Sequence, residues 1–156
     1  MNWNALAALA AVGATIATAA GFGGTVWMIL SAARQARTKW EDDLTHEYRR
    51  IMQRLPLGAR LNEHVPDCEF EGKLPAFLDY FDLSNQQAIL RKSGRVSRDT
   101  WAEWRAGIGG SLQSVAFAKA WTFVQQRNPG LFAELKELEA TKFVTDPPDW
   151  KRSSRW

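Results

Sequence analysis

Charged side chains are absent from the first 33 residues of the chain and frequent in the rest. Residues 5–33 also lack proline, so this range can form one uninterrupted helix. At about 1.5 Å per residue the helix is about 43 Å long, which exceeds the ~30 Å hydrocarbon core of a bilayer. The pattern predicts a transmembrane anchor over residues 1–33 that crosses the lipid bilayer once.

A cleaved signal peptide and a buried soluble helix are the two other interpretations of this segment. A signal peptide begins with positive residues and ends at a neutral processing site, whereas this segment begins "MNWNALAALA" and runs into "ARQARTK". A soluble helix of this length without a polar face needs an unusually large protein around it. The anchor is therefore the favoured interpretation.

Positive charges follow the predicted anchor directly, and only the terminal amine precedes it. The residues expected to determine topology are Arg34, Arg37 and Lys39. The positive-inside rule places the amino terminus outside and the remainder of the chain in the cytoplasm. The expected location is the cytoplasmic (inner) membrane, as a single-pass protein.

Small residues recur at four-residue spacing along the predicted anchor. Gly13, Ala17 and Gly21 form one row, and Ala20 and Gly24 lie on an adjoining one. Small residues at this spacing let two helix backbones approach closely, which predicts a packing face for a second copy or for another membrane protein. Chance pairs in an alanine-rich anchor are the alternative.

After the anchor, apolar residues recur at steps of three, four and seven, which is a helical period. This stripe consists of Trp40, Leu44, Tyr48, Ile51 and Leu55. No proline interrupts it before Pro56, so we expect a juxtamembrane helix over residues 34–55 that continues the anchor. The stripe is short and irregular, which favours packing against the following domain over a coiled-coil seam.

Residues 56–74 combine prolines and glycines with no sustained period, which predicts a connecting loop. The loop holds one cluster with metal-ligand chemistry: Glu63, His64, Asp67, Cys68 and Glu69. One His with one Cys at this spacing matches no established zinc site. We therefore expect an exposed polar loop, with no metal and no cofactor.

The rest of the chain predicts a small multi-helix cytoplasmic domain over residues 75–141. The expected helices cover residues 75–92, a stretch that begins at Ser97, residues 114–127 and residues 130–141. No stretch alternates with the period of a strand, so the fold class is all-α.

Local signals indicate where these helices begin and end. Pro75 suits a first helical position, Gly94 suits a stop, and Ser97 is a favourable N-cap. Glycines at 107–110 are expected to thin or end the helix that begins at Ser97 and to allow close contact with a neighbour. The adjacent prolines of the last segment predict a flexible tail over residues 142–156.

Composition supports a packed domain without disulfide bonds. The chain has eight Trp and eight Phe residues, and large aromatic residues are typical of a folded core. Cys68 is the only cysteine, which excludes an intrachain disulfide.

Polar and aromatic residues gather in the middle of the predicted domain and form a candidate partner surface. Its members are Asp79, Asp82, Asn85, Gln86, Arg91, Arg95, Trp101, Trp104 and Arg105. Arg and Trp dominate the energetics of many protein interfaces. The alternative, which we favour, is a polar network that locks two helices together, with the indoles in the core.

The segment "LDYFDLSNQQAILRKSGRVSRDTWAEWRAGI" contains the motifs YFDL-x-N-x-Q, GRV and TW-x-x-W-x-x-GI. It resembles a loosely defined set of small, uncharacterised bacterial proteins with one amino-terminal span and a helical cytoplasmic domain. The resemblance implies a bacterial origin and the same plan of an anchor followed by helices, and it implies no activity.

These features favour a membrane-anchored, non-enzymatic interaction or scaffold protein. The alternative is an accessory subunit of a larger integral membrane complex that packs through its Ala/Gly-rich span. We expect no catalytic residues, because His46, His64 and Cys68 form no recognisable nucleophile–base pair. We expect no nucleic-acid partner, since the net charge is only +3 and topology explains the basic cluster after the anchor.

Overall fold

The structure, a computed structural model, describes residues 39–150. All regular secondary structure in this range is helical, which confirms the all-α fold class for this part of the chain. The predicted anchor and its row of small residues lie outside the described residues, as do Arg34 and Arg37. Among the helices described between residues 39 and 150, none combines the length and the apolar character required to cross a membrane.

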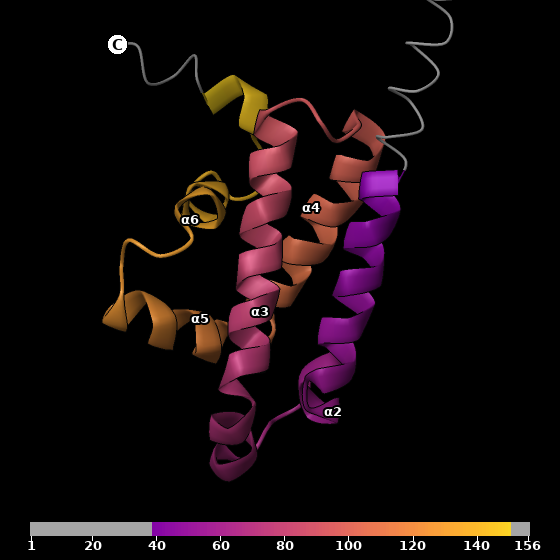
Figure 1. Ribbon diagram of the computed structural model, residues 1–156. Helices are drawn as coiled ribbons and strands as arrows, with labels where there is room; N and C mark the ends of the chain where they lie inside the picture. Colours follow the sequence, from indigo (N-terminus) through magenta and orange to yellow (C-terminus); the bar gives the residue numbers. More distant parts are fainter. Residues whose placement is uncertain (1–38, 151–156) are drawn as a thin grey trace, which may run out of the picture. The chain divides into compact units, whose positions relative to one another are not determined.

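The helix over residues 39–54 packs its apolar stripe against the domain (purple in Figure 1). Leu44, Ile51 and Leu55 are buried, which confirms core packing for these positions. Trp40 is the exception on the predicted stripe, because its side chain is 52% exposed. The helix ends before Pro56, as expected, because a proline ring disfavours helical backbone in the preceding residue.

The predicted loop over residues 56–74 is wrong for much of its length. A short helix, α2, covers Leu57–Arg60, and the long helix α3 covers Asp67–Lys92. Pro75 therefore lies inside α3 and not at its first position. Pro66 stands at the N-cap of α3, one position before its first helical residue.

Burial of the first turn explains why α3 begins eight residues early. Phe70 is 4% exposed, and its ring packs 5.4 Å from that of Phe77. Lys119 of α5 lies over the Phe70 ring, 4.4 Å from its centroid, and also pairs with the Asp67 carboxylate. Burying a Phe side chain stabilises by about 1.5–3 kcal/mol, which offsets most of the ~3 kcal/mol that an interior proline costs.

The central helix of the domain is α3, which contacts α4 (Arg98–Gln113), α5 (Val115–Arg127) and α6 (Ala133–Ala140). In Figure 1 the helix over residues 39–54 and α4 lie on the same side of α3 and run opposite to it, while α5 crosses its lower part. The core between α3 and α5 is aromatic. Phe117 lies edge-on to Tyr80 at 4.7 Å and to Phe77 at 5.1 Å, and Trp121 packs on Phe81 at 5.1 Å.

The turn between α3 and α4 follows the local signals in the sequence. Gly94 adopts φ +77°, and the Arg95 amide donates to the Leu90 carbonyl at 2.9 Å, closing the end of α3. The Ser97 hydroxyl accepts a hydrogen bond from the Thr100 amide at 3.0 Å, so the expected N-cap of α4 is confirmed.

The glycines at 107–110 do not end α4, which continues to Gln113. The expectation of close contact is confirmed at one of them. A Cβ atom added to Gly109 would lie 3.3 Å from the Phe143 ring, so this glycine lets the end of the chain approach α4.

The prediction of a flexible tail is wrong for residues 142–150, whereas residues 151–156 lie outside the described part of the chain. Phe143 packs on Gly109, a 3₁₀ helix, η1, covers Pro147–Asp149, and Trp150 is buried. The segment η1 packs on α3, close to the carboxyl-terminal end of α3 (Figure 1). The tail is ordered because its aromatic side chains enter the core.

Replacing Gly107 by alanine should stabilise the protein by about 0.5–1 kcal/mol, since no atom lies within 4 Å of an added Cβ and alanine favours helix. Gly109→Ala should be less stable than Gly107→Ala, because the new methyl group meets Phe143. Denaturant unfolding of both variants measures the difference. Equal free energies of unfolding would contradict the close approach of Phe143 to α4.

Candidate functional site

Arg91 belongs to the predicted partner surface, but its guanidinium holds the segment around Asp146 in place. Its Nε and Nη2 atoms donate to the two carboxylate oxygens of Asp146 at 2.8 and 2.5 Å. Its Nη1 donates to the Val96 carbonyl at 3.0 Å. Both side chains are mostly buried, and the Asp146 carboxylate raises the pKa of Arg91. A paired, bidentate contact of this kind connects α3 to the segment before η1.

Asn85, also predicted to contact a partner, caps a helix of its own domain. Its Oδ1 atom accepts hydrogen bonds from the amides of Glu134 and Leu135 at 3.0 and 3.1 Å. These are donors in the first turn of α6 that have no partner within the helix. Phe132 at the N-cap position of α6 has no hydroxyl or carboxylate to offer, so α3 supplies the cap.

The start of α4 receives a similar contact that no local pattern in the sequence indicates. The Glu41 carboxylate accepts from the Ser97 amide at 3.0 Å and from the Thr100 hydroxyl at 2.9 Å. Glu41 lies in the helix over residues 39–54, more than fifty residues earlier in the chain. A complete capping box has Glu or Gln three residues after the capping serine, but Thr100 occupies that position here. Glu41 supplies the missing carboxylate from another helix.

The other predicted surface residues are scattered. Asp79 pairs with Arg54 at 2.6 Å, Gln86 donates to Asp82, and Arg105 donates to the Val144 carbonyl. Arg95 is exposed, and Trp101 is 1% exposed in the core. The nine residues therefore do not converge on one surface. Asn85 and Arg91 take part in the alternative arrangement, a polar network between helices.

Trp104 lies in the wall of a cavity of about 300 Å³ between three helices. The lining residues are Thr45, Tyr48, Tyr80, Gln87, Glu103, Trp104, Gly107 and Ile108. The buried Tyr80, Gln87 and Ile108 form its floor, and the exposed Tyr48, Glu103 and Gly107 form its mouth. Except for Trp104, none of these residues belongs to the predicted surface, because the lining comes from helices distant in sequence.

Tyr80 is protonated at neutral pH. Burial raises the pKa of its phenol to about 12, and hydrogen bonds with Ser111 and Ser84 only partly oppose this effect. The hydroxyl therefore remains a neutral hydrogen-bonding group beneath the cavity.

Because the phenol of Tyr80 holds its proton to a higher pH in the folded chain, its contribution to the free energy of unfolding is complete below pH ~10. The contribution should be lost as the pH rises to about 12. Over this interval the free energy of unfolding should fall by about 2 kcal/mol more in the protein than in the Tyr80→Phe variant. Denaturant unfolding at about pH 9 and about pH 11.5 measures the loss.

Tyr48→Phe provides the control, because Tyr48 is the only other tyrosine of the chain. This variant should keep the same loss as the unmodified protein. A Tyr80→Phe variant with an unchanged pH dependence would contradict the assignment to Tyr80.

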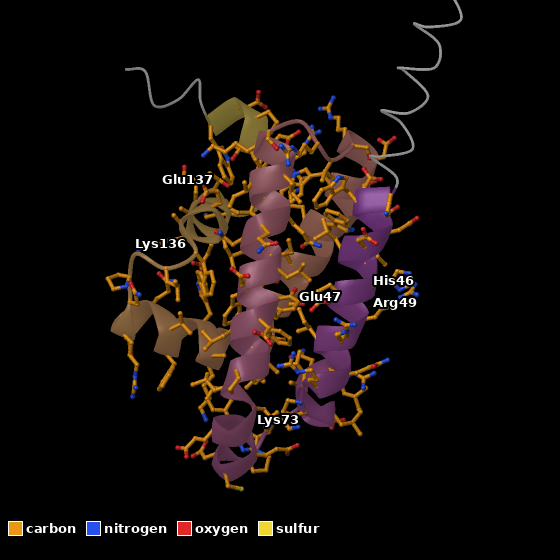
Figure 2. All side chains as sticks on the ribbon, viewed as in Figure 1. His46, Glu47, Arg49, Lys73, Lys136 and Glu137 are labelled. Atoms are coloured by element: carbon orange, nitrogen blue, oxygen red, sulfur yellow. The ribbon has the colours of Figure 1, made fainter. Side chains whose placement is uncertain are left out.

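A second feature is an exposed apolar region that we call the α2 face. It consists of Tyr48, Arg49, Met52, Gln53, Leu57, Arg60 and Leu61, which together line a surface depression. Leu57 is 63% exposed and Leu61 is 57% exposed, although both are large apolar side chains. Figure 2 shows Arg49 on the side of its helix turned away from α3. Buried Ala59 holds α2 in place between the two leucines.

Neither feature has the composition of a catalytic centre. The cavity holds one carboxylate and no histidine, cysteine or serine among its lining residues. Within residues 39–150 no three His, Cys, Asp or Glu side chains lie close enough together to hold a metal ion. Both features present apolar side chains beside a few polar ones, a composition that is typical of binding surfaces.

No protein-family model, curated protein or solved structure matches this chain. The resemblance to small bacterial single-span proteins therefore stays a prediction.

Proposed function

We propose that this protein is a membrane-anchored, non-enzymatic interaction protein whose helical domain binds a partner through the α2 face. The observation that carries the proposal is the exposure of Leu57 and Leu61 beside Arg49 and Arg60. Large apolar side chains that stay exposed together, with arginines around them, are typical of protein interfaces.

The way the domain uses its polar side chains supports this proposal. Hydrogen bonds within the domain engage the side chains of Arg91, Asn85 and Glu41, which connect its helical elements. The two leucines of the α2 face have no such structural use, because Ala59 provides the buried contact of α2. Their burial against a partner would remove apolar area from water, which is the main favourable term in protein association.

The charge of the α2 face indicates the chemistry of the partner. Arg49 and Arg60 are its only charged residues, and both are exposed cations. A partner segment with apolar residues flanked by Asp or Glu fits this surface, with the leucines giving affinity and the arginines giving orientation.

The test compares the full chain with a variant that carries Leu57→Ser and Leu61→Ser, after isolation from native membranes in mild detergent. The variant should recover its partner at least about tenfold less well, since two apolar anchors are removed. Val115→Ser with Val144→Ser is the matched control, because these exposed apolar residues lie outside the α2 face.

Mass spectrometry identifies the recovered protein, and its binding segment should be acidic and amphipathic. Equal recovery with both variants would overturn the assignment of the α2 face. Recovery of a second copy alone would also overturn it, since the face itself carries no acidic residue.

We also propose that the anchor places the amino terminus outside and the domain in the cytoplasm, on the basis of Arg34, Arg37 and Lys39. Cys68 reports on this arrangement because it is exposed, so its burial cannot block a reagent. A membrane-impermeant maleimide should leave Cys68 unlabelled in intact cells and label it after permeabilisation.

A variant with Cys68→Ser and Asn2→Cys is the control for labelling from outside. It should react in intact cells, because residue 2 lies at the outer end of the predicted anchor, before the uninterrupted helix expected over residues 5–33. Labelling of Cys68 in intact cells would contradict the proposed topology.

The second candidate function, an accessory subunit of an integral complex, rests on the small-residue row of Gly13, Ala17 and Gly21. Replacing all three by leucine separates the two functions. An accessory subunit should lose its membrane partners in this variant. A protein that binds through the α2 face should still recover the partner of that face.

A further inference from the structure

We propose that the cavity between the helix over residues 39–54, α3 and α4 binds a small organic cation of the quaternary ammonium class. This inference goes beyond the proposed interaction function and does not depend on it. It rests on the aromatic lining of the cavity, the single carboxylate at its mouth and its size.

The cavity has the form of a ligand site open at one side. Its volume of about 300 Å³ lies at the lower end of the range for small-molecule sites. Tyr80 is 2% exposed, Gln87 is 5% exposed and Ile108 is 3% exposed, so the floor is removed from solvent. A ligand can enter past Tyr48, Glu103 and Gly107, which are exposed at the mouth.

The side chains that line the cavity favour a cation. Three aromatic residues, Tyr48, Tyr80 and Trp104, contribute to its wall and floor. The rings of Tyr48 and Tyr80 lie 6.3 Å apart between centroids and are inclined by 56°, so they form two sides of an angle. The negative faces of aromatic rings attract ammonium groups, and sets of such rings bind quaternary ammonium ligands.

The charge at the mouth points to the same ligand class. Glu103 is the only charged residue of the lining, with no Lys or Arg beside it there. Within residues 39–150 the Glu103 carboxylate has no ion-pair or hydrogen-bond partner. An anionic ligand would therefore meet a negative charge without compensation, while a cation would meet an unpaired carboxylate.

The polar groups of the lining indicate the chemistry of the part of the ligand beyond its ammonium group. The Gln87 amide can donate or accept a hydrogen bond, and the Thr45 hydroxyl, which donates to the Glu41 carbonyl at 2.9 Å, can accept one, which suits a hydroxyl on a short chain. One carboxylate with neutral neighbours does not provide the several oxygen ligands that a metal ion requires. Choline and the choline headgroup of a lipid both have the required chemistry.

The experiment titrates choline into the full chain in a maltoside detergent and measures heat by isothermal calorimetry. We expect a dissociation constant in the millimolar range or below. The neutral isostere dimethylbutanol has the same shape without the charge, and it should bind at least about fivefold more weakly. Equal binding of the two compounds would overturn the proposal.

Gly107→Leu tests whether choline occupies this cavity, because the added side chain grows from a helical position with no atom within 4 Å of its Cβ. This variant should fold and should bind choline at least about tenfold more weakly. Gly110→Leu is the matched control, since Gly110 is also an open position in α4 but does not line the cavity. Unchanged binding by Gly107→Leu would overturn the location.

Glu103→Gln tests the carboxylate and should weaken choline binding by about threefold or more, while leaving dimethylbutanol unaffected. Glu137→Gln, an exposed position on α6, is its control (Figure 2).

Titration in nanodiscs with and without phosphatidylcholine then distinguishes the source of the ligand. Competition by the lipid identifies a headgroup as the ligand, and unchanged binding identifies the free cation; no heat with choline in either medium would overturn the proposal.

Discussion

The packing of α3 against the aromatic residues of α5 is the contact on which the rest of the domain depends. Phe77, Tyr80 and Phe81 lie on consecutive turns of one helix and are almost fully buried. Phe117 and Trp121 meet them edge to face, an arrangement that contributes about 0.5–1.5 kcal/mol per pair beyond area burial. Because α3 also touches α4, α6 and η1, each later element packs on a surface that this aromatic cluster holds in place.

The same helix carries both the structural polar contacts and one side of the cavity. Asn85 and Arg91 leave α3 toward α6 and the segment before η1, whereas Tyr80 and Gln87 line the cavity shared with α4. Asn85 lies on a different side of α3 from Tyr80 and Gln87, whereas Arg91 lies on nearly the same side as Gln87, one turn closer to the end of the helix. The helical period thus separates Asn85 from the cavity, and position along the helix axis separates Arg91 from it, so neither residue competes with the groups that line the cavity.

Local patterns in the sequence predicted the elements whose causes are local. The steps between Leu44, Ile51 and Leu55 identified the packed face of the first described helix, and Ser97 and Gly94 identified the turn before α4. The start of α3 was missed because Pro75 is a strong local signal, while the stabilising contacts of Phe70 come from Phe77 and from Lys119 of another helix. The order of residues 142–150 was missed for a similar reason. Asp146 acquires its role only when the chain brings it to Arg91, and Phe143 only when it reaches Gly109.

The candidate site was less predictable than the fold. Trp104 was identified from its type, but the cavity around it needs Thr45 and Tyr48 from one helix and Tyr80 and Gln87 from another. No spacing within a single helix reports which of its residues will face a helix fifty residues away. Proximity along the chain placed Asn85 and Arg91 in the predicted partner surface. Only the three-dimensional contacts show that Asn85 caps α6 and that Arg91 pairs with Asp146.

The Glu41 contact gives the helical domain a chemically defined beginning. Its carboxylate satisfies the start of α4, so a domain that lacks this residue leaves the Ser97 amide and the Thr100 hydroxyl without that acceptor. The compact unit of the chain begins at Trp40, one residue earlier. The part of the chain nearest the predicted span is therefore integral to the fold of the domain and is not a spacer whose length can be changed freely.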